Sequence, residues 1–153
     1  MDFMLQAVKE AFFGIRHNHG GPFGAIIVRN GKIIASAHNT VIKTNDPTAH
    51  AEVNAVRKAA KKLKRFDLSD CVIYTNCEPC PMCLAAIEWA RIKKVYYSQT
   101  RIEAEKIGFS DKAIYADIAR APNTKDTKLT QTTSKESKVA FIEWAKKKDK
   151  VRY

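Results

Sequence analysis

The apolar residues of the N-terminal half change their period from helical to extended. Residues 3–15 place apolar side chains on one face of a helix, and a Gly-Gly-Pro sequence then ends it. Residues 23–29 and 32–39 are rich in β-branched and other apolar residues. The Asn30-Gly31 pair between these runs predicts a β-hairpin with a two-residue turn.

The middle of the chain alternates predicted helices and strands. Residues 40–47 are predicted to form a loop. A helix is predicted over residues 49–63, with Thr48 as its N-cap, because a threonine oxygen accepts hydrogen bonds from free N–H groups. Further on, strands are predicted at residues 71–75 and 95–98, a helix at 82–90, and weaker helices at 102–107 and 112–119.

The C-terminal part is more polar. Residues 120–134 contain proline and several threonines, so we expect an irregular segment with at most one edge strand. A last helix is predicted over residues 135–148, with Val139, Ile142 and Ala145 on one face. The order helix, hairpin, helix, strand, helix, strand, helix is typical of an α/β sandwich around a mixed sheet.

The composition is that of one globular domain, which we place over residues 1–153. Hydrophobic residues make up 45% and charged residues 28%, which excludes extensive disorder. No apolar run approaches the roughly 20 residues of a membrane span, and the N-terminus has no secretory signal pattern. We therefore expect a cytoplasmic protein without a membrane partner.

The net charge of +11 comes from 27 basic and 16 acidic residues. The basic residues concentrate in residues 57–65 and near the C-terminus. We interpret both runs as solvated helix faces, and a nucleic-acid-binding patch is the alternative.

Two short motifs carry the candidate chemistry, each near the N-terminus of a predicted helix. They are HAE at residues 50–52 and CEPCPMC at residues 77–83. Zinc binds imidazole and thiolate ligands, and Cys80 and Cys83 are close enough in sequence to share an ion with His50. Three protein ligands leave a fourth position for water, as in catalytic sites. Glu52 could then move protons to and from that water.

Two other metal sites use the same cysteines. Cys77 would complete a closed Cys3His zinc site in a non-catalytic, zinc-stabilised nucleic-acid-binding module, and Cys71 would suggest an iron–sulfur cluster. The prolines around Cys80 favour a position for Cys77 on the strand side of the turn. Cys71 is interpreted as a small core residue.

The pattern H-x-E followed by P-C-x-x-C is the signature of zinc-dependent base deaminases. The chain resembles the cytidine deaminase-like superfamily and, within it, the bacterial guanine deaminases. The resemblance runs nearly end to end. It includes GPFGA at residues 21–25, NDPTAHAE at 45–52, TNCEPCPMC at 75–83, WAR at 89–91 and IGFSD at 107–111.

The resemblance implies a fold, a metal and an assembly. The fold is a three-layer α/β/α sandwich around a mixed five-stranded sheet. One Zn²⁺ per chain is held by His50, Cys80 and Cys83, with water as the fourth ligand and Glu52 as the proton shuttle. The implied assembly is a homodimer that exchanges residues 135–153 between its subunits.

The resemblance also implies a substrate pocket for a purine base. Asn39 holds the ring, and Phe23 and Trp89 line the pocket. Asp111 recognises guanine near its amino group or carries protons. Tyr153 closes the active site of the partner subunit. The implied reaction hydrolyses guanine to xanthine and ammonia.

The zinc motif is shared with tRNA adenosine deaminases, which are the rival interpretation. The net charge of +11 favours that rival. The segment at residues 107–111 and the C-terminal tyrosine favour the guanine deaminases, although Ser110 replaces an acidic residue often found there. A closing C-terminal tail would also block the open groove that a polynucleotide needs.

Overall fold

The computed structural model describes residues 2–121, 124–125 and 127–151. The chain divides into two units, Met1–Asp111 and Lys112–Tyr153. The first unit contains α1 (Phe3–Arg16), β1 (Gly24–Arg29), β2 (Lys32–His38), α2 (Val41–Thr44), α3 (Ala51–Leu63), β3 (Val72–Cys77), α4 (Pro81–Trp89), β4 (Lys94–Gln99) and α5 (Arg101–Lys106).

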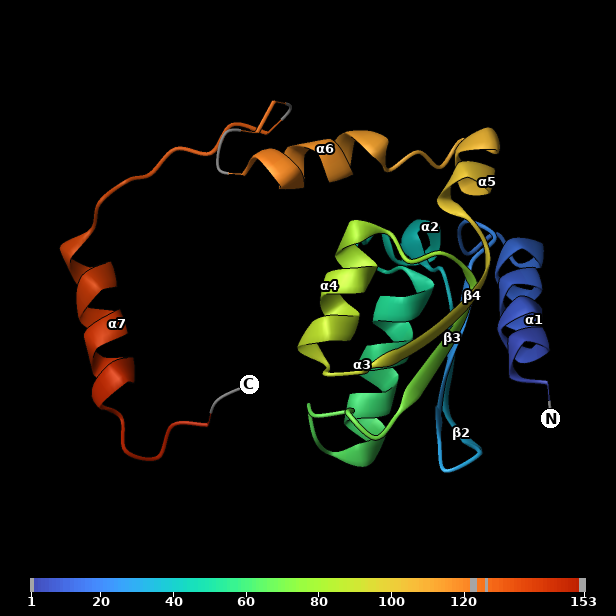
Figure 1. Ribbon diagram of the computed structural model, residues 1–153, viewed down its shortest axis with the longest axis horizontal. Helices are drawn as coiled ribbons and strands as arrows, with labels where there is room; N and C mark the ends of the chain where they lie inside the picture. The colour runs from blue at the N-terminus through green and yellow to red at the C-terminus, as the bar shows by residue number, and fades with distance from the viewer. Residues whose placement is uncertain (1, 122–123, 126, 152–153) are drawn as a thin grey trace. The chain divides into compact units, whose positions relative to one another are not determined.

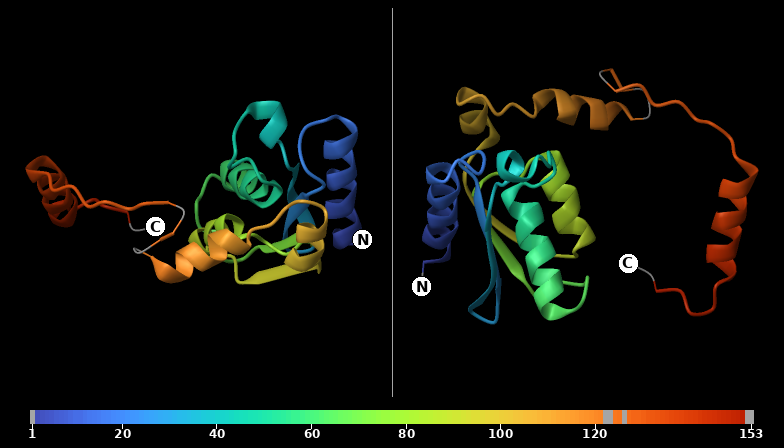
Figure 2. Two further views of the ribbon diagram at one scale, coloured as in Figure 1. Left: turned by 90° about the horizontal axis from the view of Figure 1, so that it is seen from above. Right: turned by 180° about the vertical axis from the view of Figure 1, so that it is seen from behind.

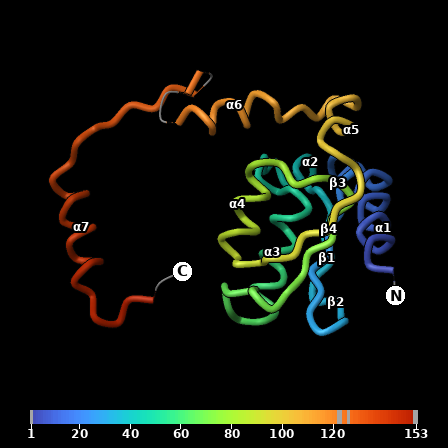
Figure 3. The backbone as a smooth tube through the Cα atoms, in the orientation of Figure 1, coloured from blue at the N-terminus to red at the C-terminus, as the bar shows by residue number. Residues whose placement is uncertain are grey.

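A mixed sheet with the order β2-β1-β3-β4 forms the centre of the first unit (Figure 3). β1 pairs antiparallel with β2 and β3, whereas β3 and β4 are parallel. The turn between β1 and β2 contains Asn30 and Gly31, both with positive φ (49° and 70°). Two such residues are what a type I′ turn requires, so the predicted hairpin is confirmed.

Helices cover both faces of this sheet. α1 packs on one face, whereas α3 packs on the other with α4 beside it (Figures 1 and 2). The inner strand β1 is buried from Gly24 to Val28. Gly24 allows α1 to approach closely, because an added Cβ would lie 2.1 Å from the carbonyl oxygen of Ala7. The first unit is therefore a three-layer α/β/α arrangement.

The prediction of a five-stranded sheet was wrong. The sheet has four strands, and the described part of residues 120–134 contains no strand. Leu129 is the one large aliphatic residue of that segment. A strand gains stability by packing an apolar face on neighbouring residues, and this segment has no such face.

The structure also differs from three local predictions. Residues 40–47, predicted as a loop, contain the short helix α2. α3 begins at Ala51 with His50 as its N-cap, and the hydroxyl of Thr48 donates instead to Asp46 (2.7 Å). The last helix ends at residue 146 rather than 148. The side chain of Thr48 bonds to Asp46 within a short turn and therefore does not cap the helix as predicted.

Basic residues of α3 make bonds within the first unit. Lys58 and Lys62 donate to the backbone carbonyls of Ser36 (2.9 Å) and Ile34 (3.0 Å). Both carbonyls belong to the edge strand β2. These side chains thus cover acceptors that an open sheet edge would otherwise present to another chain.

The second unit contains α6 (Lys112–Arg120) and α7 (Lys135–Lys146). Ser134 caps α7 by accepting a hydrogen bond from the N–H of Ser137 (3.1 Å). Neither helix has a buried residue. Among the described residues of both units, no helix has the length and apolar content that crossing a bilayer requires.

Candidate active site

The starts of α3 and α4 bring the two sequence motifs together. His50 is the N-cap of α3 and Cys80 is the N-cap of α4. Cys83 lies in the first turn of α4, which begins with Pro81. Proline suits the first helical position because its fixed φ is helical and its missing N–H would have no partner there. The two helix N-termini therefore supply three metal-binding side chains to one point.

The three side chains form a group of suitable ligand atoms. His50, Cys80 and Cys83 each place one ligand atom within 4.8 Å of the others. Nδ1 of His50 lies 3.5 Å from the Sγ atoms of both Cys80 and Cys83. A tetrahedral zinc ion with its usual bond lengths would hold such atoms about 3.6 Å apart. The donor set and its spacing therefore fit zinc.

The other two cysteines lie outside this group. Cys77 is buried, and its thiol faces the carbonyl oxygen of Thr100 at 4.0 Å. Cys71 belongs to the apolar core and donates to Asp70 (3.5 Å). Among the described residues, no group of four metal-binding atoms forms around either one. This arrangement supports neither the closed Cys3His site nor the iron–sulfur alternative.

Glu52 lies beside the ligand group in a buried position. The residue is 5% exposed. Thr75, buried in the middle of β3, donates to Oε1 of Glu52 (3.3 Å), and Sγ of Cys83 lies 3.4 Å from Oε2. Burial raises the pKa of Glu52 because the charged carboxylate loses water. The arrangement provides a proton-accepting group that is both oriented and shielded from solvent.

The two ligand thiols have opposite acidities. A hydrogen bond from the thiol of Cys83 lowers the pKa of Cys80. The same bond, together with burial, raises the pKa of Cys83 far above its usual value. The hydrogen bond with Cys80 also raises the pKa of His50. In the metal-free site the cysteine pair therefore holds one proton, which a metal ion would displace.

Asn39, the predicted purine-binding residue, is buried with 4% exposure. Its backbone N–H donates to the carbonyl of Phe23 (3.0 Å), and its side-chain oxygen accepts from the N–H of Val41 (3.1 Å). Gly20 packs against it so closely that an added Cβ would lie 2.1 Å from this oxygen. Asn39 and Phe23 are thus tied to each other.

Phe23 makes an aromatic pair that sequence reasoning missed. Its ring lies 4.9 Å from that of Phe109 in a T-shaped arrangement. Phe109 was noticed only as part of the IGFSD segment at residues 107–111. The available signal was a phenylalanine placed just after a short predicted helix, at residues 102–107. Thr75 was likewise missed, although a threonine in an apolar strand is a sign of a buried polar contact.

The remaining predicted residues differ in position. Asp111 is partly buried, and burial raises the pKa of its carboxyl group, which also interacts with the charge of Cys80. Trp89 ends α4, about 13 Å along the helix axis from Cys80, and is 66% exposed. The structure thus does not bring Trp89 to the ligand group of its own chain. Tyr153 lies outside the described residues.

Comparison with known proteins agrees with this geometry. Residues 1–99 match the model of the cytidine and deoxycytidylate deaminase zinc-binding region. The chain belongs to this deaminase family. It is 46% identical to the guanine deaminase of Bacillus subtilis over 151 residues, which cover 99% of this chain and 97% of that protein.

Solved structures of the deaminase family agree with the match. An X-ray structure of guanine deaminase from Bacillus subtilis has a TM-score of 0.94 and covers 99% of this chain and 96% of its own, at 46% identity. Guanine deaminase from Nitrosomonas europaea has a TM-score of 0.68 at 30% identity, covering 72% of this chain and 64% of its own.

A tRNA-specific adenosine deaminase from Aquifex aeolicus matches a shorter part of this chain. It is 48% identical over 77 residues, which are 50% of this chain and 51% of that protein. The similarity to this relative is therefore confined to part of the chain, in contrast to the nearly full-length match with the Bacillus subtilis protein.

Proposed function

We propose that this protein is a zinc-dependent guanine deaminase, a hydrolase that converts guanine and water to xanthine and ammonia. The observation that carries the proposal is the His50, Cys80 and Cys83 ligand group with the buried carboxylate of Glu52 beside it. The similarity to a guanine deaminase along 99% of the chain supports the choice of guanine.

In this proposal His50, Cys80 and Cys83 hold one Zn²⁺ per chain, and water completes the coordination. The bound ion supplies Lewis-acid chemistry that lowers the pKa of water towards roughly 7. Glu52 would take a proton from the attacking water as the water oxygen bonds to the carbon that bears the exocyclic amine, and would deliver that proton to a ring nitrogen. It would then pass the second water proton to the amine, so that the C–N bond breaks, ammonia leaves and the new oxygen becomes the carbonyl of xanthine. The hydroxyl of Thr75 holds the carboxylate of Glu52 in place for both transfers.

The purine pocket is proposed on the same basis. Asn39 holds the ring through the polar groups of its side chain, and Phe23 provides an aromatic wall, extended by Phe109. Asp111 serves near the amino group of the base. Trp89 and Tyr153 are also proposed as residues of the purine pocket. The exposed position of Trp89 at the far end of α4 suits a role toward a second subunit better than one in its own chain.

A homodimer that exchanges residues 135–153 is part of the proposal, with one deaminase domain formed from residues 1–153. The support comes from α7, in which Phe141 and Trp144 are three residues apart, lie on one face, and are 76% and 47% exposed. A helix of this length gains most of its stability from packing an apolar face, and this face is uncovered. A second copy of the chain would cover it.

A cytoplasmic location suits the candidate site. All four cysteines are free, and reduced thiols persist in the reducing cytoplasm. The tRNA adenosine deaminase rival keeps less support, since the tRNA-specific adenosine deaminases compared with this chain match 50–73% of it, against 99% for the guanine deaminase of Bacillus subtilis.

The test is ammonia release from zinc-loaded protein. Guanine, adenine, cytosine, guanosine, cytidine and an anticodon stem-loop RNA would be supplied side by side. We expect turnover of guanine, with xanthine as the product. Deamination of the RNA without turnover of any free base would reject the proposal in favour of the tRNA rival, whose binding should weaken steeply with salt.

A further inference from the structure

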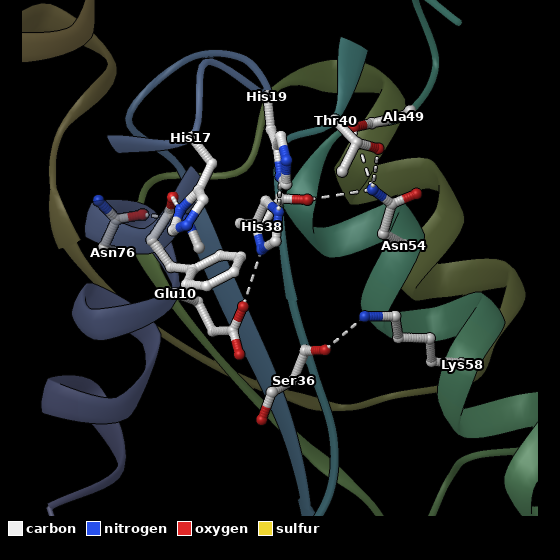
Figure 4. A network of polar contacts seen from close by, with 12 residues as sticks. Glu10, His17, His19, Ser36, His38, Thr40, Ala49, Asn54, Lys58 and Asn76 are labelled. Carbon is white, nitrogen blue, oxygen red and sulfur yellow. Dashed lines mark hydrogen bonds and ion pairs between the residues drawn. The ribbon is translucent and has the colours of Figure 1, made fainter. Parts of the chain in front are cut away.

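A single asparagine side chain, that of Asn54 on α3, contacts the segments before and after α2 (Figure 4). Its Nδ2 atom lies 3.1 Å from the carbonyl oxygen of His38, 3.0 Å from Oγ1 of Thr40 and 3.1 Å from the carbonyl oxygen of Ala49. The side chain is partly buried. Its amide therefore joins the end of β2, the start of α2 and the start of α3.

The orientation of the Asn54 amide follows from its neighbours. Backbone carbonyls accept hydrogen bonds and do not donate them, so the NH2 group must face His38 and Ala49. Two N–H hydrogens serve three acceptors, which requires one shared bond. An aspartate of the same shape would have no hydrogen to donate when ionised and would place negative charge against carbonyl oxygens.

The residues that Asn54 binds flank the candidate site. His38 and Thr40 precede and follow Asn39, the proposed purine-binding residue. Ala49 directly precedes the zinc ligand His50. The Thr40 N–H also donates to the carbonyl of Ala49 (2.9 Å), so the two segments contact each other directly under the Asn54 amide. The backbone N–H of Asn54 itself donates to the carbonyl of His50 (2.9 Å).

The opposite side of the Asn39 segment is held by Glu10 of α1 and by His19, which follows α1. The imidazole of His38 lies 2.9 Å from a carboxylate oxygen of Glu10 and 2.8 Å from the ring of His19. Figure 4 shows the His38 ring between these groups on one side and its carbonyl directed to Asn54 on the other. The strand end that carries Asn39 is thus anchored at two points, and of the anchoring side chains Asn54 is the one that lies on α3, the helix that begins directly after His50.

We propose that Asn54 is a positioning residue for deamination, which sets the position of the purine held by Asn39 relative to the metal site at His50. This inference rests on the proposed function. Asn54 acts through Asn39 and the start of α3, without touching the reacting atoms. Reactions of this kind are sensitive to placement, because a shift of about 1 Å can lower the rate by roughly 100-fold.

The first experiment compares Asn54→Ala and Asn54→Asp with Lys58→Met. Lys58 lies one turn further along α3 and donates to the carbonyl of Ser36 on the same strand (2.9 Å), so its loss weakens the helix–strand contact away from Asn39. Zinc content, thermal unfolding, kcat and KM would be measured for each. We expect both Asn54 variants to retain zinc and lose roughly 30- to 100-fold in kcat/KM, with Lys58→Met within about twofold of the parent.

The second experiment is a double-mutant cycle with Asn39→Ala. If Asn54 acts through Asn39, Asn54→Ala should lower kcat/KM by less than about threefold in the Asn39→Ala background. An equal loss in both backgrounds, or loss of zinc from the Asn54 variants, would overturn the proposal, because either result indicates general support of the fold or metal site. Should Asn54→Asp fail to fold, Asn54→Ala and the milder Thr40→Val carry the same test.

Different results would reject the proposed function and the positioning role of Asn54. The substrate would be chosen as whichever of guanine, cytosine, adenosine-containing RNA or their relatives the parent protein deaminates fastest. Turnover of a substrate other than guanine would reject the proposed function, while the Asn54 ratios would still be measured on that substrate. Unchanged kcat/KM in the Asn54 variants would reject the positioning role whatever the substrate.

Discussion

The two units of the chain differ in how far they bury their apolar side chains. In residues 2–111, Ile26, Ile27 and Ile73 have no exposed surface. In the second unit, α6 and α7 bury no residue, and Phe141 is 76% exposed. Burial of this kind supplies most of the stability of a folded unit, so the first unit has what it needs to fold and α7 does not.

The residues of the candidate active site therefore lie in one unit, and the helix proposed to contact a second subunit lies in the other. His50, Glu52, Cys80 and Cys83 all come from the first unit, where packed helices and strands hold them. A site that must place ligand atoms within a few tenths of an ångström requires such rigid support. The apolar face of α7 suits contact with a second subunit. Variants in the two units should therefore change different measured quantities.

The largest effect is expected at Glu52 in the first unit. Glu52→Gln keeps the shape of the side chain but cannot accept a proton, so kcat should fall by about 10²- to 10⁴-fold while zinc remains bound. Steady-state kinetics and metal analysis measure both. Glu78→Gln, in the same zinc motif, is the control, because Glu78 accepts from the backbone N–H of Arg101 instead (3.0 Å). Normal turnover in Glu52→Gln would contradict the proton-shuttle role.

Cys83→Ala and Cys77→Ala test which sulfurs belong to the metal site. Cys83→Ala should lower zinc affinity by more than the roughly 100-fold cost of losing an outer-shell partner, because it removes a ligand. Cys77→Ala should retain zinc and change the free energy of unfolding by no more than about 1–2 kcal/mol. Competition with a zinc chelator measures both affinities. Loss of zinc from Cys77→Ala would instead support the closed site.

The corresponding change in the second unit is Phe141→Ser in α7. If this face packs on a second copy, its loss should weaken dimerisation by about 30-fold, which corresponds to the ~2 kcal/mol of a central aromatic contact. Light scattering over a dilution series measures the dissociation constant. The zinc content should not change, because the ligands lie in the other unit. An unaltered dimer, or a parent protein that is monomeric, would show that this face has another role.

The smallest effect is the pH dependence of zinc binding. The raised pKa of Cys83 means that its thiol is protonated at neutral pH, whereas the lowered pKa of Cys80 leaves that sulfur ionised. Zinc must then displace one proton, so its affinity should rise about tenfold per pH unit near neutrality. The raised pKa of His50 adds a second proton toward lower pH. Calorimetry in buffers of different ionisation enthalpy counts the protons, and an affinity independent of pH would contradict this arrangement.

Much of the fold could be predicted because its signals are local. The helical period of residues 3–15 and the Asn30-Gly31 turn depend on neighbours a few positions away. The fifth strand was wrong because a strand depends on a partner edge and an apolar face, which residues 120–134 do not supply. α2 was missed because a helix of four residues has no measurable period.

By itself, the sequence determined that His50, Cys80 and Cys83 form one group, that Glu52 lies beside it, and which elements carry these residues, since short motifs contain their own spacing. Only the tertiary structure decided that Thr75 orients Glu52, that Phe109 meets Phe23, and that Asn54 joins the segments around Asn39 and His50. These contacts cross between separate elements. Their partners are chosen by strand pairing and helix packing, which are properties of the whole fold and leave no periodic signal along the chain.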